Sequence, residues 1–341
     1  MSQKMKMTNP EMPFLHKNIA AAGSLGLKMI QPGSMNAAKG VVICGTGPTL
    51  LDDDTLPHIR ELASQGYHIC ALKEAVQVLT DLGITVHYTV AMDPAKKQIA
   101  KTPLVKGVKY LIASSCSPDL FKHLLDGGME VEIFHSACGA KNEIQLYHQH
   151  FGDTTVAEGG YTVANRAYAA MTILGFKRRI MAGCPFGWRE GQQYYAEGVK
   201  GQPGNSGPPF EDKGKIDGRA WYTKLDLMTS AQDLALRVKK GELEIIGDSL
   251  VASLAKHDEA YIRSVAEKSV QRGPVNEATQ RKVEFKIDKD SGDLEMQVLR
   301  LGGPKIQIDQ DNGDVTVTSP QWEVEPPPAR KVKQNEQARA A

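Results

Sequence analysis

The stretch Val41-Val-Ile-Cys-Gly-Thr-Gly-Pro48 decides the fold. Its four apolar residues, Val41–Cys44, are typical of a buried strand, and the glycines that follow indicate a tight turn. A helical pattern begins shortly afterwards, at Leu56–Ser64. A strand, a glycine-rich turn and a helix in that order are how α/β domains present backbone N–H groups to a phosphate. The predicted nucleotide contacts at this turn are Gly45, Thr46, Gly47, Pro48 and Thr49.

Standard phosphate loops differ from this turn. The dinucleotide fingerprint needs a third glycine where Leu50 stands, and the Walker loop needs a Gly-Lys-Ser/Thr that is absent from the turn. The pattern alone therefore fits a nucleotide site and fits equally a tight turn that binds nothing.

Composition limits the classes of protein that the chain can belong to. The 341 residues are 41% apolar, enough for a large core, and the net charge of +1 gives no electrostatic argument for nucleic acid or a membrane as partner. The five cysteines are widely spaced without a CxxC pair, which indicates reduced, buried thiols. The N-terminus lacks the continuous apolar segment of a signal peptide, so we expect a cytoplasmic protein.

Apolar runs alternate with helical patterns from about residue 39 onward, which predicts an α/β fold with a doubly wound, mainly parallel Rossmann-like sheet. The predicted strands are Val41–Cys44, Tyr67–Leu72, Thr85–Ala91, Lys109–Ala113, Glu130–His135, Thr155–Ala157, Arg179–Ala182 and Leu243–Ile246. The predicted helices are Leu56–Ser64, Lys73–Leu82, Asp119–Leu125, Tyr161–Leu174 and Lys224–Lys239. Between the last two, residues 185–218 are rich in glycine, proline and aromatic residues and are interpreted as a lid, a binding loop or a disordered segment, with the aromatic residues favouring a lid.

A short internal repeat marks the C-terminal part. Phe285–Leu294 recurs as Lys305–Val315, and each copy alternates apolar and polar residues around a Ser-Gly or Asn-Gly turn, which predicts a β-hairpin. Exposed hairpin edges could pair with another copy or another chain, so a homo-oligomer or an assembly role is possible in this region. The predicted divisions are an N-terminal extension at 1–38, a Rossmann-like nucleotide-binding domain at 39–260, the repeated hairpins at 275–322 and a proline-rich, charged tail at 323–341 that is expected to be disordered.

Several segments together resemble the MptE-like family, whose archaeal namesake is a 6-hydroxymethylpterin diphosphokinase with a Rossmann-like core. The segments are Gly45–Leu50, Cys70–Ile84, Tyr88–Pro94 and Glu158–Asn165, with a weaker piece at Ile216–Thr223. The resemblance implies a Mg²⁺-dependent transfer of diphosphate from ATP to a small acceptor, a pterin in the namesake. The expected ligands are therefore ATP, Mg²⁺ and a small-molecule acceptor.

Two further alternatives remain open. The glycine turn is similar to the nucleotide-sugar loop of certain bacterial sialyltransferases, and MptE-like domains occur in motility accessory factors linked to flagellin glycosylation, which implies a CMP-sugar as the donor. The family commonly continues Gly-x-Asp-Leu after the strand at Arg179–Ala182, whereas this chain has Gly183-Cys184-Pro185-Phe186. The missing carboxylate leaves a non-catalytic assembly protein with a degenerate site as the third hypothesis.

The remaining candidate residues follow strands or precede the longest helix. Asp93 comes after the strand at Thr85–Ala91, at the edge where α/β sheets bind ligands, and is a candidate for Mg²⁺ or ribose contact or a helix cap. Gly159, Gly160 and Thr162 could donate to a second anion at the start of the helix at Tyr161–Leu174, and glycines there could equally serve packing.

Histidines are the usual proton-transfer residues, and two of them fall in or at the end of predicted strands. His87 and His135 are therefore the catalytic candidates, with a structural role as the alternative for each. Arg166, in the predicted helix at Tyr161–Leu174, is a candidate for an anion contact.

Overall fold

The chain divides into two units that are described separately, residues 1–274 and residues 275–341. The computed structural model describes residues 13–137, 142–153, 155–187, 212–216, 219–223 and 225–271 of the first unit. In the second unit it describes residues 282–287, 294–299, 305–308 and 315–318.

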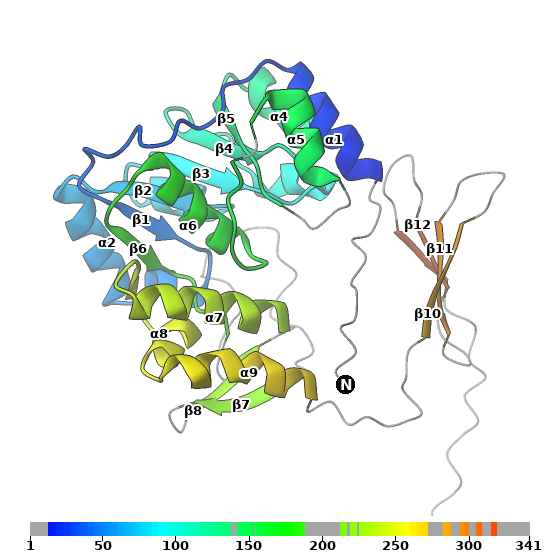
Figure 1. Cartoon of the computed structure of the whole chain (residues 1–341). Coiled ribbons are helices and arrows are strands. Elements are labelled where there is room, and N and C mark those ends of the chain that lie inside the picture. Colours follow the sequence, from blue (N-terminus) through cyan, green and yellow to red (C-terminus); the bar gives the residue numbers. More distant parts are fainter. Residues whose placement is uncertain are drawn as a thin grey trace, which may run out of the picture. The chain divides into compact units, whose positions relative to one another are not determined.

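A parallel, seven-stranded sheet forms the centre of the first unit (Figure 1), which confirms the predicted doubly wound α/β fold. Its strands, in spatial order, are β5 (Glu130–Phe134), β4 (Lys109–Ala113), β3 (Tyr88–Ala91), β2 (His68–Leu72), β1 (Val41–Cys44), β6 (Arg179–Ala182) and β9 (Glu244–Ile246). Strand β1 is central, and all four of its residues are fully buried. Its continuous apolar sequence follows from this, because a parallel strand covered on both faces has no polar side.

Helices cover both faces of the sheet. The described helices are α1 (Pro13–Ser24), α2 (Thr55–Ser64), α3 (Ala75–Asp81), α4 (Pro118–Asp126), α5 (Glu143–Phe151), α6 (Val163–Leu174), α7 (Leu225–Lys239), α8 (Leu250–Ala255) and α9 (Glu259–Gln271), with the 3₁₀ helices η1 (Pro48–Leu51) and η2 (Lys96–Lys101). Parallel crossovers are right-handed, so the connections that lead from β1 out to β5 lie on one face. The return from β5 to β6 puts α6 on the other face, where it packs across β1, β2, β3 and β6 (Figure 1).

The chain reverses its direction of travel through the sheet between β1 and β6. From β1 it moves outward to β2 and finally β5, and it then returns to β6 on the opposite side of β1. The segments that follow β1 and β6 therefore start side by side and leave in different directions. In open α/β sheets this topological switch point, at the carboxyl ends of the strands, is where ligands bind.

Residues 13–38, predicted as an extension, pack into the first unit. Helix α1 contacts α4 and α5, and it buries Leu15, Ile19 and Ala22 completely or almost completely. Met29 then forms a parallel bridge with Ile133 at the outer side of β5. The start of the described chain therefore covers the edge strand of the sheet.

A β-hairpin was not predicted between the sixth strand and the helix α7. Strands β7 (Asp212–Ile216) and β8 (Arg219–Thr223) pair antiparallel there, partly inside the segment that the sequence indicates as a loop. Ile216 of β7 and Trp221 and Thr223 of β8 are buried, so both strands of the hairpin pack against the unit. The sequence does carry a signal for it, because Asp217-Gly218 separates the two strands and this dipeptide is typical of two-residue hairpin turns. Of the predicted lid, residues 188–211, 217 and 218 lie outside the described residues.

The second unit contains four short antiparallel strands in sequential order. They are β10 (Lys282–Ile287), β11 (Leu294–Leu299), β12 (Lys305–Ile308) and β13 (Val315–Thr318). Phe285 pairs with Met296, and Ile306 pairs with Val317. The predicted tail at 323–341 lies outside the described residues, and the role of this unit in assembly stays a prediction. Of the helices that the structure describes, none combines the length and apolarity needed to cross a membrane.

Candidate functional site

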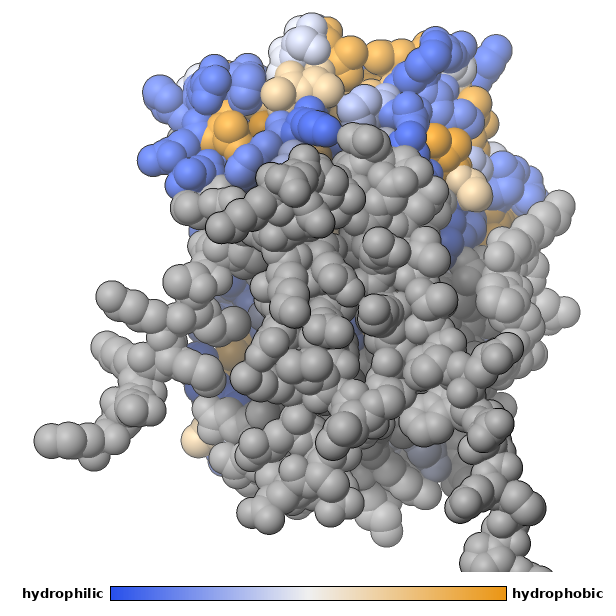
Figure 2. Space-filling model, turned by 90° about the vertical axis from the view of Figure 1, so that its right-hand side faces the viewer, coloured by the Kyte–Doolittle hydropathy of each residue, from blue (hydrophilic) through white to orange (hydrophobic). Residues whose placement is uncertain are grey.

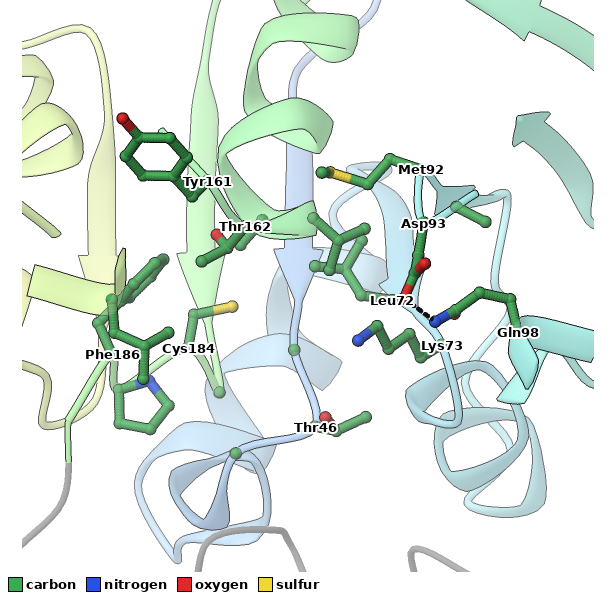
Figure 3. Close-up of a pocket in the computed structure, with 18 of the residues that line it drawn as sticks. Thr46, Leu72, Lys73, Met92, Asp93, Gln98, Tyr161, Thr162, Cys184 and Phe186 are labelled. Carbon is green, nitrogen blue, oxygen red and sulfur yellow. Dashed lines mark hydrogen bonds between the residues drawn. The ribbon is translucent and has the colours of Figure 1, made fainter. Parts of the chain in front are cut away.

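A cavity of about 420 Å³ opens at the carboxyl ends of the central strands. Its walls come from the turn after β1, the ends of β2 and β3, the N-terminus of α6 and the segment after β6. Figure 3 labels Thr46, Leu72, Lys73, Met92, Asp93, Gln98, Tyr161, Thr162, Cys184 and Phe186 among its lining residues. The cavity thus lies at the switch point of the sheet, and segments from both halves of the unit build it.

Five of the predicted nucleotide contacts line this cavity. They are Gly45, Thr46, Gly47, Asp93 and Thr162. The other four are not among its lining residues. They are Pro48, Thr49, Gly159 and Gly160. The assignment of these nine residues to a nucleotide stays a prediction, and the structure adds where each of them lies.

The glycine turn after β1 is pressed against the segment after β6. The N–H of Gly45 donates to the carbonyl of Ala182 (2.9 Å), and the N–H of Gly47 donates to the carbonyl of Gly183 (2.8 Å). A Cβ on Gly47 would lie 2.3 Å from Cδ of Pro185 and 2.7 Å from the Gly183 carbonyl oxygen. Glycine is therefore required at position 47 for close contact between two chain segments, and both N–H groups are already used within the protein.

Pro48 and Thr49 continue from this turn into η1 and away from the cavity. Pro48 occupies the first position of η1, where its fixed φ fits and no N–H is needed. Thr49 is only 2% exposed. Of the turn, Thr46 is the residue whose half-buried side chain lies at the cavity wall (Figure 3).

Lys73 provides a positive charge at the cavity and was not predicted from the sequence. It follows β2 directly, and its ammonium group points toward the turn at Thr46 (Figure 3). Its φ of +51° lies in the left-handed region, which costs a residue with a side chain about 1–2 kcal/mol. The sequence places Lys73 at the start of a helix, but α3 begins at Ala75. Its position directly after a buried strand is the signal that could have identified it.

Asp93 lies across from the glycine turn, two residues after β3 ends. Its Oδ1 accepts from the N–H of Ala95 (2.9 Å), and its Oδ2 accepts from Nε2 of Gln98 (2.6 Å; Figure 3). Gln98 lines the cavity and is itself only 3% exposed. The carboxylate is therefore held in one orientation ahead of η2, whose N-cap residue is Ala95 and not Asp93.

A Mg²⁺ site at Asp93 is chemically compatible with these contacts. Each carboxylate oxygen has two lone pairs and uses one of them on a protein donor, so each can still accept a cation. Mg²⁺ is commonly held by one or two carboxylates together with phosphate oxygens and water. Within the described residues there is no group of three or more His, Cys, Asp or Glu side chains placed to hold a metal. Asp93 would therefore share the ion with the substrate.

The N-terminus of α6 forms another wall of the cavity. Thr162 is the N-cap residue, and its Oγ1 accepts from the N–H of Asn165 (3.4 Å). Gly159 (φ +116°) and Gly160 (φ +23°) precede it and adopt backbone conformations that suit glycine. The two glycines shape the entry into the helix, while the partial positive charge of the helix N-terminus faces the cavity.

Cys184 and Phe186 line the side of the cavity that follows β6. Burial in the cavity wall raises the pKa of the Cys184 thiol to about 12, so the group is a neutral thiol at physiological pH. Phe186 has a φ of +58°, an unusual conformation for a bulky residue, and is 6% exposed. Lys73 and Phe186 thus place backbone strain on two different walls of the same cavity, as is common where a ligand binds.

The structure places His87 at the opposite edge of the sheet. It lies one residue before β3 begins, and its Nδ1 accepts from the N–H of Ile69 (3.1 Å). It lines a different cavity of about 270 Å³, together with Arg60 and Thr85. Burial, and then the neighbouring His68, lower the pKa of His87. The predicted strand began at Thr85, whereas β3 begins at Tyr88. His87 therefore lies at the amino end of the strand and not near its carboxyl end.

His135 lies at the correct edge of the sheet but is completely buried beside the outermost strand. Its Nδ1 is 2.9 Å from Oγ of Ser114, and its ring stacks on Tyr147 at 4.1 Å between centroids. Burial lowers the pKa of His135 to about 4, an effect that Asp153 partly offsets. Neither predicted catalytic histidine is among the residues that line the 420 Å³ cavity.

Arg166 also has a structural position. Its guanidinium donates to the carbonyls of Ala157 and Ala137, both at 2.9 Å, and its side chain is 8% exposed. These bonds tie α6 to the chain that follows β5. Arg166 therefore binds two backbone carbonyls in place of the predicted anion.

Comparisons with known proteins agree with this architecture. Residues 24–191 match the family described as 6-hydroxymethylpterin diphosphokinase MptE-like. The fold is similar to that of the MAf glycosyltransferase from Magnetospirillum magneticum AMB-1, with a TM-score of 0.50 and 13% sequence identity. The similar region covers 78% of this chain and 42% of that protein, so this chain spans less than half of its length. No curated protein sequence matches the chain. Residues 24–191 of the chain are therefore similar to the MptE-like family.

Proposed function

We propose that the cavity at the carboxyl edge binds a donor nucleotide and that the chain is a transferase. The observation that carries this proposal is the convergence of three different segments on one cavity. Lys73 contributes an ammonium group, Thr162 marks the N-terminus of α6, and Asp93 contributes a carboxylate. A cation and a helix N-terminus together attract phosphate, whereas a carboxylate beside them favours a bridging cation or a ribose hydroxyl.

Transfer of diphosphate from ATP to a small acceptor is the activity that the family match favours. In this reaction an acceptor hydroxyl gives up its proton to solvent or a base and its oxygen bonds to the β-phosphorus, while the bond to the oxygen shared with the α-phosphate breaks and AMP leaves. Lys73 and the N-terminus of α6 would orient the phosphates, and Asp93, fixed by Ala95 and Gln98, would hold Mg²⁺. The ion would supply neutralisation of the phosphate charge. The acceptor would be a pterin by resemblance.

Glycosyl transfer from a nucleotide-activated sugar is the second candidate. Among the cavity-lining residues that the structure describes, Asp93 is the only carboxylate and Lys73 the only cation. Pro185 stands where a carboxylate is common in the family. A CMP-sugar carries a single phosphate, so it needs less neutralisation than a triphosphate and can bind without a metal.

Calorimetric titration of the full chain with ATP and with CMP, each with and without Mg²⁺, tests the proposal. Diphosphate transfer predicts ATP binding that depends on Mg²⁺, and an Asp93→Asn variant, which keeps an oxygen for the N–H of Ala95, should weaken it about tenfold or more. Glycosyl transfer predicts CMP binding that Mg²⁺ does not change. Failure of the wild-type chain to bind either nucleotide would contradict both candidates and favour the non-catalytic alternative.

A further inference from the structure

Tyr161 is unusual among the exposed hydrophobic side chains of the described chain. The large hydrophobic residues that are exposed are Phe14, Leu25, Leu104, Leu125, Ile144 and Tyr161. Isolated exposed hydrophobic residues are normal on protein surfaces, and Figure 2 shows hydrophobic patches separated by hydrophilic residues on the side that it displays. Tyr161 differs because it is 68% exposed and also lines the 420 Å³ cavity.

The backbone of Tyr161 is fixed by a hydrogen bond, although its ring is exposed. Its N–H donates to Oγ of Ser230 on α7 (2.8 Å), and Ser230 is fully buried. Thr162, the next residue, is the N-cap of α6. The ring is therefore presented from a fixed backbone between two helices. This arrangement limits the entropy that is lost when a ligand binds to the ring.

The ring lies on a different side of the cavity from the charged groups. Figure 3 shows Tyr161 on the side of α6 and α7, whereas Lys73 and Asp93 occupy the opposite side. The cavity wall between them includes the neutral thiol of Cys184. An elongated ligand with a charged end and a flat aromatic end would match this distribution.

We infer that the ring of Tyr161 is the stacking platform for the base of the donor nucleotide. This inference rests on the proposed function and names the part of the ligand that the site recognises on its α7 side. Because Tyr161 directly precedes the N-cap of α6, a phosphate at the helix N-terminus brings the attached nucleoside next to the ring. Stacking of a base on an aromatic side chain contributes about 1–3 kcal/mol and tolerates different bases.

Nucleotide affinity of Tyr161 variants tests this inference. The full-length wild type and Tyr161→Ala are titrated with CMP and with ATP plus Mg²⁺, and Tyr161→Ala should weaken the nucleotide that binds by about 5-fold to 150-fold. Tyr161→Phe should retain the affinity, because stacking needs the ring and not the hydroxyl. Phe14→Ala on α1 is the matched control, since it removes an exposed aromatic ring outside the cavity and should change nothing.

A spectroscopic measurement separates stacking from an indirect structural effect. In Tyr161→Trp the introduced indole should be quenched when nucleotide is added, over and above the wild-type response, because the base stacks on it. Unchanged affinity in Tyr161→Ala, with wild-type binding intact, would overturn the stacking role and leave the proposed function standing. Absence of nucleotide binding by the wild type would overturn both.

Discussion

The two edges of the central sheet have different chemistry. At the carboxyl edge, Thr46, Lys73 and Asp93 follow three neighbouring strands and meet at one cavity with the N-terminus of α6. At the amino edge, charged groups are paired with one another. Arg178 donates to both carboxylate oxygens of Glu244, at 2.6 and 2.8 Å.

Further pairs continue along the amino edge. Lys109 contacts Glu130 (2.9 Å) and Glu132 (2.7 Å) on the neighbouring strand. His68 and His87 have ring centroids 4.5 Å apart, and burial lowers the pKa of each. Charged groups at the amino edge therefore pair with one another, whereas Lys73 and Asp93 at the carboxyl edge line a cavity large enough for a ligand. The position of a residue relative to the end of its strand distinguishes these roles better than its chemical type.

The largest effect is expected from the glycine turn at the carboxyl edge. Gly47→Val should displace the segment at Pro185, because the new Cβ would lie 2.3 Å from its ring. We expect a loss of at least ~2 kcal/mol in the free energy of unfolding, measured with urea, and loss of nucleotide binding.

A glycine at the amino edge provides the matched control for this variant. Gly107 has a left-handed backbone (φ +83°), unlike Gly47 (φ −67°), but a Cβ there would meet nothing within 4 Å. Gly107→Ala should cost only about 1 kcal/mol of backbone strain and leave binding unchanged. Equal losses of unfolding free energy and of binding in the two variants would show that glycine is required at position 47 for a reason other than close packing against Pro185.

His135 lies at the carboxyl edge but does not line the cavity, so we expect it to affect the stability of the fold and not the binding of a nucleotide. Burial lowers its pKa in the folded chain to about 4, whereas the unfolded chain takes up the proton near pH 6.5. The contribution of His135 to the free energy of unfolding is therefore fully present above pH 6.5. It falls as the pH drops from 6.5 toward 4, by up to about 3 kcal/mol at about 1.4 kcal/mol per pKa unit.

A His135→Gln variant should lose that part of the pH dependence. Its free energy of unfolding, measured with urea between pH 7 and pH 4.5, should fall less steeply than that of the wild type. Nucleotide affinity at pH 7 should stay within about twofold of the wild-type value, since His135 does not line the cavity. Parallel pH profiles for the two proteins would contradict the buried, neutral state of this histidine.

The smallest free-energy change is expected for one side chain at each edge. Lys73→Met removes the ammonium group at the cavity and should weaken nucleotide binding about tenfold, or about 1.4 kcal/mol, with a smaller dependence on salt. His87→Ala at the amino edge should leave the affinity unchanged. Calorimetry on both variants gives the comparison, and a stronger effect of His87→Ala would reverse the roles of the edges.

A third variant examines the strained backbone at Lys73. Lys73→Gly also removes the ammonium group but relieves the left-handed conformation, so it should bind as weakly as Lys73→Met and unfold at a higher denaturant concentration. Lower stability of the glycine variant would show that the conformation at position 73 carries no strain.

The sheet and its edge positions could be predicted from the sequence because buried parallel strands have continuous apolar runs. Strands β1, β4 and β6 have the predicted bounds, and Asp93 was placed at the correct edge because it follows such a run. His87 was misplaced for a related reason. The apolar residues Ile84 and Val86 are buried before the strand begins, so hydrophobicity alone extends β3 toward its N-terminus.

Other features of the site depend on contacts between distant segments. The N–H groups of Gly45 and Gly47 looked free for a phosphate, and only the position of the chain at Ala182 and Gly183 shows that they are used. The left-handed turn at Lys73 and the exposure of Tyr161 likewise follow from tertiary packing. Local sequence cannot specify which segments approach one another, so these residues could not be assigned in advance.

A crystal structure of the full chain with bound nucleotide, grown with CMP and with ATP plus Mg²⁺, tests the central claim most directly. The account predicts a phosphate at the carboxyl edge, within hydrogen-bond reach of Nζ of Lys73 and the N-terminus of α6, and a base on the ring of Tyr161. A nucleotide bound at the amino edge, in the cavity of Arg60 and His87, would contradict it.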